Sequence, residues 1–121
     1  LEYLKNNDFI TFKNKKSIFA MTAHIVFEAI DKEDCATHSK KVIKYIRNKI
    51  GFKNIIISDD ISMKALKYSF SENVSKAYSS GCNLVLHCNA NFREMSILGK
   101  IAPKVNRFVI KKTSEFYKLL S

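Results

Sequence analysis

Residues 37–63 read THSKKVIKYIRNKIGFKNIIISDDISM, an amphipathic segment followed directly by a uniformly apolar one. Four apolar residues recur at helical spacing in the first segment, namely Val42, Ile43, Ile46 and Ile50. Ser39 stands before them as an N-cap and Gly51 after them as a stop, so we predict a helix between these two residues. The run NIIIS over 54–58 is too apolar for a half-exposed antiparallel strand and is typical of a parallel strand buried on both faces. A helix leading into such a strand predicts an α/β fold.

The rest of the chain repeats this alternation of apolar runs and amphipathic segments. SIFAMTA over 17–23 and NLVLHCN over 83–89 predict two further buried strands. Three more helices are predicted, over about 72–80 before Gly81, over 91–103 with Met95, Leu98 and Ile101 facing inward, and over about 114–120. Strands joined by helices of this length imply right-handed crossovers, so the carboxyl ends of the three strands should lie at one edge of a parallel sheet.

The chain is strongly basic, with a formal net charge of +10 from 21 Lys and Arg against 11 Asp and Glu. Such an excess raises nucleic acid as a partner. Arginine is rare among these cations, and the lysines are scattered, with their densest cluster at Lys13, Lys15 and Lys16. We therefore expect no nucleic-acid partner and keep a basic nucleic-acid-binding module only as an alternative. The hydrophobic content of 46% is enough for a core, in one small domain or in a piece of a larger one.

The cysteines Cys35, Cys82 and Cys88 have no C-x-x-C spacing, which is unlike a disulfide framework or a zinc site. We expect reduced thiols in a cytoplasmic protein, with Cys82 and Cys88 as small core residues. No apolar run approaches the roughly 20 residues that cross a bilayer, and no signal peptide is visible, so we expect no membrane association. The 3 glycines form neither G-x-G-x-x-G nor a Walker sequence, which is unlike a nucleotide-binding site. Together with the cysteine spacing, this leads us to expect neither a cofactor nor a metal.

Ionisable residues gather at the predicted carboxyl edge of the sheet, in MTAH, SDD and HCN. Because side chains alternate along a strand, Asp59 and Asp60 should point in different directions. In the plain interpretation they cap the next helix or bind Lys64. In the functional interpretation one carboxylate faces a substrate, and hydrolysis of a glycosidic or phosphoryl bond then needs a second group for proton transfer. His24 and His87 at this edge are more typical of structural hydrogen-bond donors than of catalysts.

Three segments in order carry a resemblance to a known family: AMTAHIVFEAID over 20–31, ATHSKKVIKYIRNKIGFKNIIISDDISMKAL over 36–66, and AYSSGCNLVLHCN over 77–89. They resemble the bacterial β-N-acetylhexosaminidases of glycoside hydrolase family 3, the cytosolic enzymes of cell-wall recycling. The likeness extends from about Phe9 to about Ile101, and the helix, glycine, strand and SDDISM in register are its most specific part. It implies a (β/α)₈ TIM barrel, of which the chain supplies about strands 6–8 with their helices.

The resemblance also implies a reaction, the removal of terminal non-reducing β-N-acetylglucosamine from muropeptide fragments by a retaining double displacement. The first aspartate of the family's S-D-D sequence is the nucleophile, which implies that Asp59 attacks the anomeric carbon and forms a covalent glycosyl-enzyme. Asp60 then supports Asp59, and the resemblance places His24, Asp60 and Met63 among the substrate-binding residues. Ser58 and Met63 are expected to shape the turn.

The chain departs from the family at Asn54, where glycine is usual, at Cys35, where proline is common, and at His38, where leucine is usual. We interpret His38 as a solvated loop residue. A segment of the type K-H-F-P-G-H-G-D, which holds sugar-binding residues and the acid/base histidine, has no counterpart in the sequence. We therefore expect residues 1–121 to be a partial catalytic domain from a longer product, inactive alone and completed by an upstream half-barrel in the same or a separate chain. An inactive gene remnant is the alternative.

Overall fold

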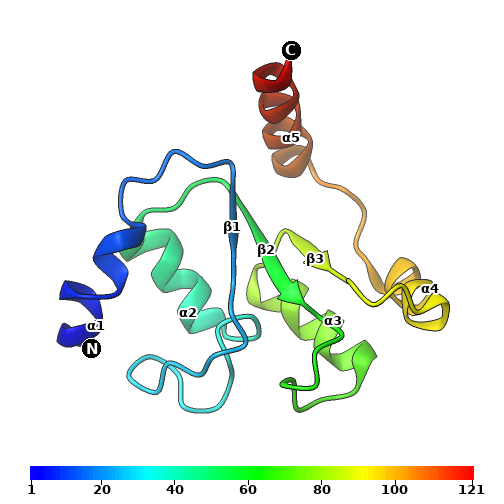
Figure 1. The fold of residues 1–121 in the computed structure, drawn as a ribbon, viewed down its shortest axis with the longest axis horizontal. Coiled ribbons are helices and arrows are strands. Elements are labelled where there is room, and N and C mark those ends of the chain that lie inside the picture. The colour runs from blue at the N-terminus through cyan, green and yellow to red at the C-terminus, as the bar shows by residue number, and fades with distance from the viewer.

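The structure, a computed structural model, describes residues 1–121 and contains one three-stranded parallel sheet. Its strands are β1 (Phe19–Met21), β2 (Ile55–Asp60) and β3 (Leu84–Leu86), and their spatial order is β1-β2-β3. The order in space equals the order along the chain, so each crossover leads to the neighbouring strand (Figure 1). The predicted α/β fold with a parallel sheet is confirmed.

Helices precede, connect and follow the strands. They are α1 (Glu2–Asn6), the 3-10 helix η1 (Phe9–Phe12), α2 (Lys40–Tyr45), the π-helix η2 (Ile46–Ile50), α3 (Phe70–Ser80), α4 (Phe92–Ile101) and α5 (Arg107–Leu120). None of them combines the length and the apolar composition that a bilayer-spanning helix requires.

The helix boundaries follow capping residues in the sequence. The Ser39 hydroxyl accepts a backbone N–H of the first turn of α2 at 3.1 Å, and Gly51 ends η2 with a left-handed φ of 84°. The helix predicted between these residues is confirmed, and its last turn is wound as a π-helix. Ser69 and Glu72 form a capping box that starts α3 earlier than predicted, and Gly81 ends this helix at φ 117°.

The core lies between one face of the sheet and the helices α2 and α3. Ala20 of β1 lies opposite Ile56 of β2, and both pack against these helices. The buried cluster consists of Ile43, Phe52, Ile56, Ile61, Val74, Ala77 and Cys82. A Cβ on Gly81 would lie 2.9 Å from Cγ2 of Ile43, so the glycine allows α2 to approach the end of α3 closely.

The opposite face of the sheet is covered at the amino end of the strands. There the ring of Phe19 meets the ring of Phe116 on α5 edge to face, with centroids 5.2 Å apart. Nearer the carboxyl edge, Met21 on the same face is 57% exposed. α5 follows α4 after an extended connection over 102–106 (Figure 1), and the ring of Phe108 on α5 lies 5.9 Å from the guanidinium of Arg47 on η2. Because parallel sheets are normally covered on both faces, this open face and the two edge strands are the least enclosed parts of the fold.

Some predicted boundaries are corrected by hydrogen bonds beyond the local pattern. β2 continues through Asp60, two residues past the predicted 54–58, because the sheet remains paired there and the N–H of Ile61 still bonds to the carbonyl of Leu86 at 2.9 Å. β1 and β3 are shorter than the predicted 17–23 and 83–89, and the prediction that they are buried was wrong. Both are edge strands whose side chains are half-buried or, at Met21, exposed. The last helix begins at Arg107 and not near 114, because the side chain of Asn106 caps it.

Three burial predictions for single residues were also wrong. Met95 is 49% exposed, because α4 contacts the core cluster through its last turns, where the inward positions of Leu98 and Ile101 are confirmed. His38 is not solvated but only 5% exposed, and the ring of Tyr68 lies 5.9 Å from its own. The burial of Cys82 is confirmed, whereas Cys88 is exposed, because β3 ends at Leu86 and the chain has left the sheet.

Candidate active site

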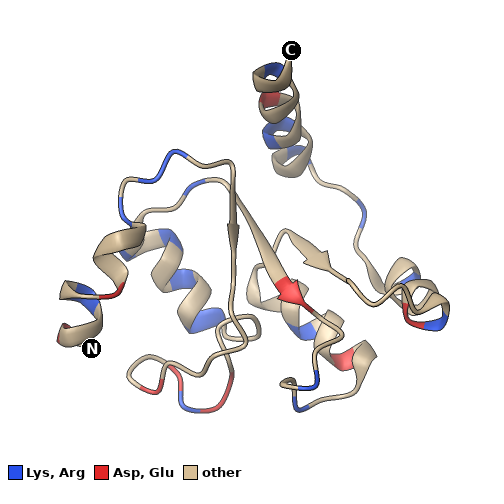
Figure 2. Cartoon of the chain, viewed as in Figure 1, with Lys and Arg blue, Asp and Glu red and all other residues tan.

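The candidate site lies at the carboxyl end of β2, where Figure 2 shows the acidic tip of the strand. Ile57 pairs with Leu84 and Asp60 pairs with Leu86. Between these two pairs β2 therefore contains one residue more than β3. The extra residue makes a β-bulge over 58–59, a feature that re-aims side chains. The hydroxyl of Ser58 accepts the N–H of Leu86 at 3.0 Å and so supplies the hydrogen bond that the bulge removes from the ladder.

Asp59 occupies the bulge with a half-buried side chain and one hydrogen bond. Its Oδ1 accepts the N–H of Asp60 at 2.8 Å, while its Oδ2 has no protein partner. The carboxylate is thus held on one side and open on the other. A carboxylate placed in this way at a strand end can attack an electrophilic carbon or stabilise a developing positive charge.

Asp60 is tied into the surrounding loops through its side chain. Its Oδ1 accepts the backbone N–H groups of Ser62 and Cys88, both at 3.1 Å, and the hydroxyl of Ser62 lies 2.8 Å from each carboxylate oxygen. Burial by itself raises the pKa of this carboxyl, but the hydrogen bonds from Ser62 and Cys88 outweigh it and hold the pKa below its ordinary value. Asp60 therefore joins the turn after β2 to the end of β3, and neither aspartate bonds to Lys64 or caps α3.

His24 links the end of β1 to the end of β2. Its Nε2 lies 2.9 Å from the backbone oxygen of Asp60, and its Nδ1 lies 2.9 Å from the hydroxyl of Thr37. The same Asp60 carbonyl also accepts the N–H of Met63 at 3.2 Å, and the Met63 side chain is 44% exposed. The four residues predicted from the sequence, Asp59, Asp60, His24 and Met63, are thus all brought together around Asp60.

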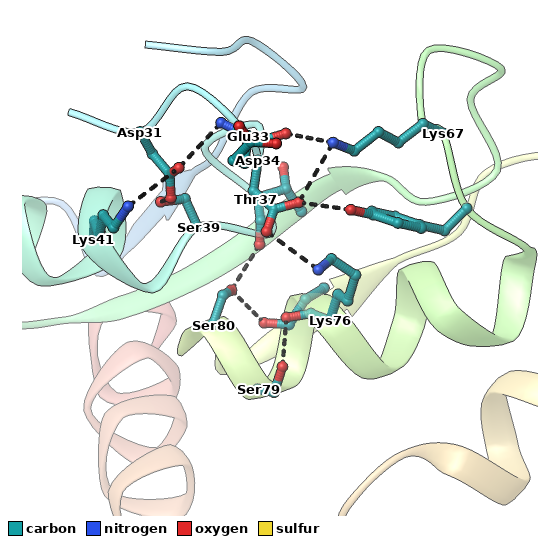
Figure 3. A network of polar contacts seen from close by, with 12 residues as sticks. Asp31, Glu33, Asp34, Thr37, Ser39, Lys41, Lys67, Lys76, Ser79 and Ser80 are labelled. Atoms are coloured by element: carbon teal, nitrogen blue, oxygen red, sulfur yellow. Dashed lines mark hydrogen bonds and ion pairs between the residues drawn. The ribbon is translucent and has the colours of Figure 1, made fainter. Parts of the chain in front are cut away.

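Thr37 is a fully buried junction between the loops behind the site. Its hydroxyl lies 2.9 Å from that of Thr22 and 3.2 Å from the carbonyl of Ala23, and its own carbonyl accepts the Ser80 hydroxyl at 2.7 Å (Figure 3). Through Thr37, the last turn of α3 supports the loop after β1 and the imidazole of His24.

An ionic cluster joins the loop after β1 to the loop and helix after β2 (Figure 3). Asp34 accepts Lys76 at 3.2 Å and the hydroxyl of Tyr68 at 3.1 Å, with Lys67 at 3.9 Å. The ammonium of Lys76 also lies 4.5 Å from the centre of the Tyr68 ring. Asp34 is half-buried, so these contacts fix the two loops to each other more firmly than exposed pairs do.

The sequence pattern missed Glu94, which organises the end of β3. Its Oε2 bonds to Nε2 of His87 at 2.8 Å and to the amide of Asn89 at 2.8 Å. These bonds, from His87 first and Asn89 second, hold the pKa of Glu94 below its ordinary value. The capping spacing from Asn91 to Glu94 at the start of α4 was the available signal. The structural role considered for His87 agrees with this pairing.

Two cavities of the fold both lie away from the aspartates. One has a volume of about 330 Å³, an apolar lining and a position between η1, β1 and α2. The other has a volume of about 580 Å³ and lies between the end of α3 and the connection after α4. No group of three or more His, Cys, Asp and Glu side chains has the spacing to hold a metal ion.

The Ser58 hydroxyl offers a direct test of the bulge. Ser58→Ala is expected to lower the free energy of unfolding by about 1–2 kcal/mol, because the N–H of Leu86 loses its partner in a buried setting. The urea midpoint of the 121-residue chain measures this. Ser75→Ala, at an exposed position of α3, is the matched control. Equal midpoints for the two variants would show that the Ser58 bond does not hold the bulge.

Comparison with known proteins decides the family of this chain. The Glycosyl hydrolase family 3 N terminal domain matches residues 2–112. The chain belongs to this family. The resemblance seen in the sequence is confirmed, and since the family 3 N-terminal domain is of the TIM-barrel type, the parallel sheet described above is a piece of that type of fold.

Individual family 3 proteins align with most of the chain. A β-hexosaminidase of Photobacterium profundum is 30% identical over 130 residues, which cover 98% of this chain and 39% of the relative. A β-hexosaminidase of Nitrosomonas eutropha is 38% identical over 71 residues, which cover 57% of this chain and 20% of the relative. The β-N-acetylglucosaminidase of Thermotoga maritima superposes with a TM-score of 0.70 at 33% identity, covering 83% of this chain and 24% of its own. This family 3 chain thus spans at most 39% of the length of these relatives.

Proposed function

We propose that this chain carries the nucleophile of a family 3 β-N-acetylhexosaminidase. In this proposal Asp59 attacks the anomeric carbon of a terminal β-N-acetylglucosamine, the glycosidic bond breaks, and the covalent glycosyl-enzyme is then hydrolysed by water with net retention. The observation that supports it most is the Asp59 carboxylate in the bulge, with one oxygen held by the Asp60 N–H and the other open.

The proposal assigns the three strands β1, β2 and β3 to about strands 6–8 of a (β/α)₈ barrel, and residues 1–121 to part of the catalytic domain. Two edge strands and a partly open face, with Met21 57% exposed, support this assignment. The remaining strands, in the same or a separate chain, would bring the acid/base group and most of the sugar pocket. The 121-residue chain alone is therefore expected to be inactive on an aryl β-N-acetylglucosaminide.

The proposed substrate is inferred from the names of the relatives. Their names specify β-hexosaminidase and β-N-acetylglucosaminidase, which supports an N-acetylglucosamine-containing saccharide, and we extend this to muropeptide fragments in the cytoplasm. Met63, with its exposed side chain after β2, is placed at the rim of the sugar site, and the Asp60 carboxylate below it. Both ring nitrogens of His24 are engaged by protein atoms, so its predicted contact with sugar would be through the edge of the ring.

A chimera tests the proposal. The aligned segment of the Photobacterium profundum β-hexosaminidase is replaced by residues 1–121, and release of 4-nitrophenol from its N-acetyl-β-glucosaminide is measured. We expect turnover, with the β-anomer of N-acetylglucosamine formed first by ¹H NMR. The isolated chain should give no turnover. A folded chimera without activity, or an α-anomer formed first, would refute the proposal.

A further inference from the structure

We propose that His24 is a positioning residue for Asp59, acting through the backbone of Asp60. This inference rests on the proposed function, in which Asp59 is the nucleophile. His24 donates from Nε2 to the Asp60 carbonyl, and Asp60 in turn donates its N–H to Oδ1 of Asp59. The carbonyl and the N–H belong to the two peptide groups on either side of one Cα, so fixing the first limits the rotation of the second.

The tautomer of His24 follows from its partners. A backbone carbonyl has no proton to give, so a hydrogen bond at Nε2 requires that this nitrogen carry the hydrogen. In the neutral ring Nδ1 then accepts from the Thr37 hydroxyl, while Thr22 donates to the Thr37 oxygen. The Thr37 hydroxyl has one proton and cannot at the same time serve the Ala23 carbonyl 3.2 Å away.

Protonation of His24 is accommodated by turning one hydroxyl. With hydrogens on both nitrogens, Nδ1 donates to the Thr37 oxygen, and the Thr37 proton becomes available to the Ala23 carbonyl. In both states Nε2 still donates to Asp60. The hydrogen bond from His24 to Asp60 therefore does not depend on the charge of the imidazole. A residue that positions a nucleophile needs a contact that is constant in this way.

Two polar groups of Asp60 are held by neighbouring residues, which makes it a rigid support. Its carbonyl accepts His24 and the N–H of Met63, and its carboxylate accepts Ser62 and Cys88. The remaining polar group of the residue is its N–H, which contacts Asp59. Because the Asp59 carboxylate has no other hydrogen bond within the protein, the direction of that N–H sets the direction in which the open carboxylate oxygen points.

Two isosteric replacements separate the two bonds of the imidazole. The amide nitrogen of Gln lies where Nε2 does and can donate to Asp60, whereas the amide of Asn reaches only the Nδ1 position beside Thr37. We expect His24→Gln to keep the hydrogen-exchange protection of the Asp60 amide within about twofold of wild type, and His24→Asn and His24→Ala to lower it about fivefold or more. The ¹³Cγ chemical shift of Asp59 should likewise stay close to wild type in His24→Gln and change in His24→Asn and His24→Ala.

The readouts are heteronuclear NMR spectra of the 121-residue chain, which need no activity. In the wild type, imidazole ¹⁵N shifts should show Nε2 protonated at pH 8 as well as pH 5. An unprotonated Nε2 at pH 8 would overturn the proposal without any variant. Equal losses of Asp60 protection in His24→Gln and His24→Asn would also overturn it, because they would indicate general packing at this position.

In the chimera, His24→Asn is expected to lower kcat about tenfold with KM unchanged, and His24→Gln is expected to restore most of it. A loss confined to KM would assign His24 to sugar binding and overturn the positioning role. If the wild-type chimera does not hydrolyse the substrate, the proposed function is refuted. The NMR spectra of the 121-residue chain would still show whether His24 orients Asp60 and Asp59.

Discussion

Replacing Asp59 by Ala in the chimera is expected to lower kcat by about a thousandfold or more. No other group at the edge can take over the attack, because the carboxylate of Asp60 is occupied by Ser62 and Cys88. The loss should be seen with 4-nitrophenyl N-acetyl-β-glucosaminide under saturating conditions. Asp8→Ala, which removes an exposed carboxylate beside η1, is the matched control and should retain wild-type turnover.

Added azide makes this prediction specific for a nucleophile. In Asp59→Ala the space of the carboxylate is open, so azide can attack the anomeric carbon while 4-nitrophenolate leaves with the bonding electrons. The expected product is the α-glycosyl azide, of inverted configuration. Loss of activity without formation of this glycosyl azide would indicate that Asp59 stabilises charge and is not the nucleophile. An unchanged kcat would show that Asp59 takes no part in the reaction.

Acid is expected to destabilise the protein through His38. Burial, reinforced by Lys76 and His24 and opposed by Asp34 and the backbone of Asn73, lowers the pKa of His38 to about 4, against 6.5 for the free side chain. A histidine with a depressed folded pKa binds its proton better in the unfolded state. Its neutral form therefore supports the fold above about pH 6.5, and that support is lost as the pH falls toward 4.

His38→Leu should remove this part of the pH dependence. The Nε2 of His38 is buried without a hydrogen-bond partner, so leucine also removes an unsatisfied polar atom. We expect the free energy of unfolding of the variant to exceed that of wild type at pH 7, and the gap to widen by about 2 kcal/mol on going to pH 4.5. Urea titrations of both chains at both pH values measure it, and carboxylates common to both cancel in the difference. A constant gap would contradict a depressed pKa at His38.

The elements that the sequence predicted best are those bounded by local chemistry. Ser39 and Gly51 define one helix because each acts on the backbone at its own position, through a side-chain acceptor and through a left-handed φ of 84°. The strands were predicted from apolar runs, of which Ile55 and Ile56 on the central strand are buried. The gathering of Asp59 and His24 followed from topology alone, because parallel strands end at one edge.

What the sequence could not supply depends on contacts distant in the chain. The bulge at Ser58 arises from the way β2 pairs with β3, which the sequence of β2 does not reveal. The alternation of side chains along a strand therefore could not predict the direction in which the Asp59 carboxylate points. His38 carries a polar side chain and was assigned to solvent, but the ring of Tyr68 and α3 enclose it. α1 and η1 have no strong apolar period, and Phe9 is buried by packing on Phe27 and Tyr45 from later segments.

The three cysteines differ in burial, and this makes selective labelling of one thiol possible. Burial raises the pKa of Cys82 to about 11, which keeps that sulfur protonated and shielded, whereas Cys88 is exposed. A maleimide dye applied at neutral pH should therefore attach to Cys88 well before Cys82. The N–H of Cys88 is bonded to Asp60, so the label would sit on backbone fixed to the aspartate edge, where its emission could report the arrival of a sugar or of another protein segment.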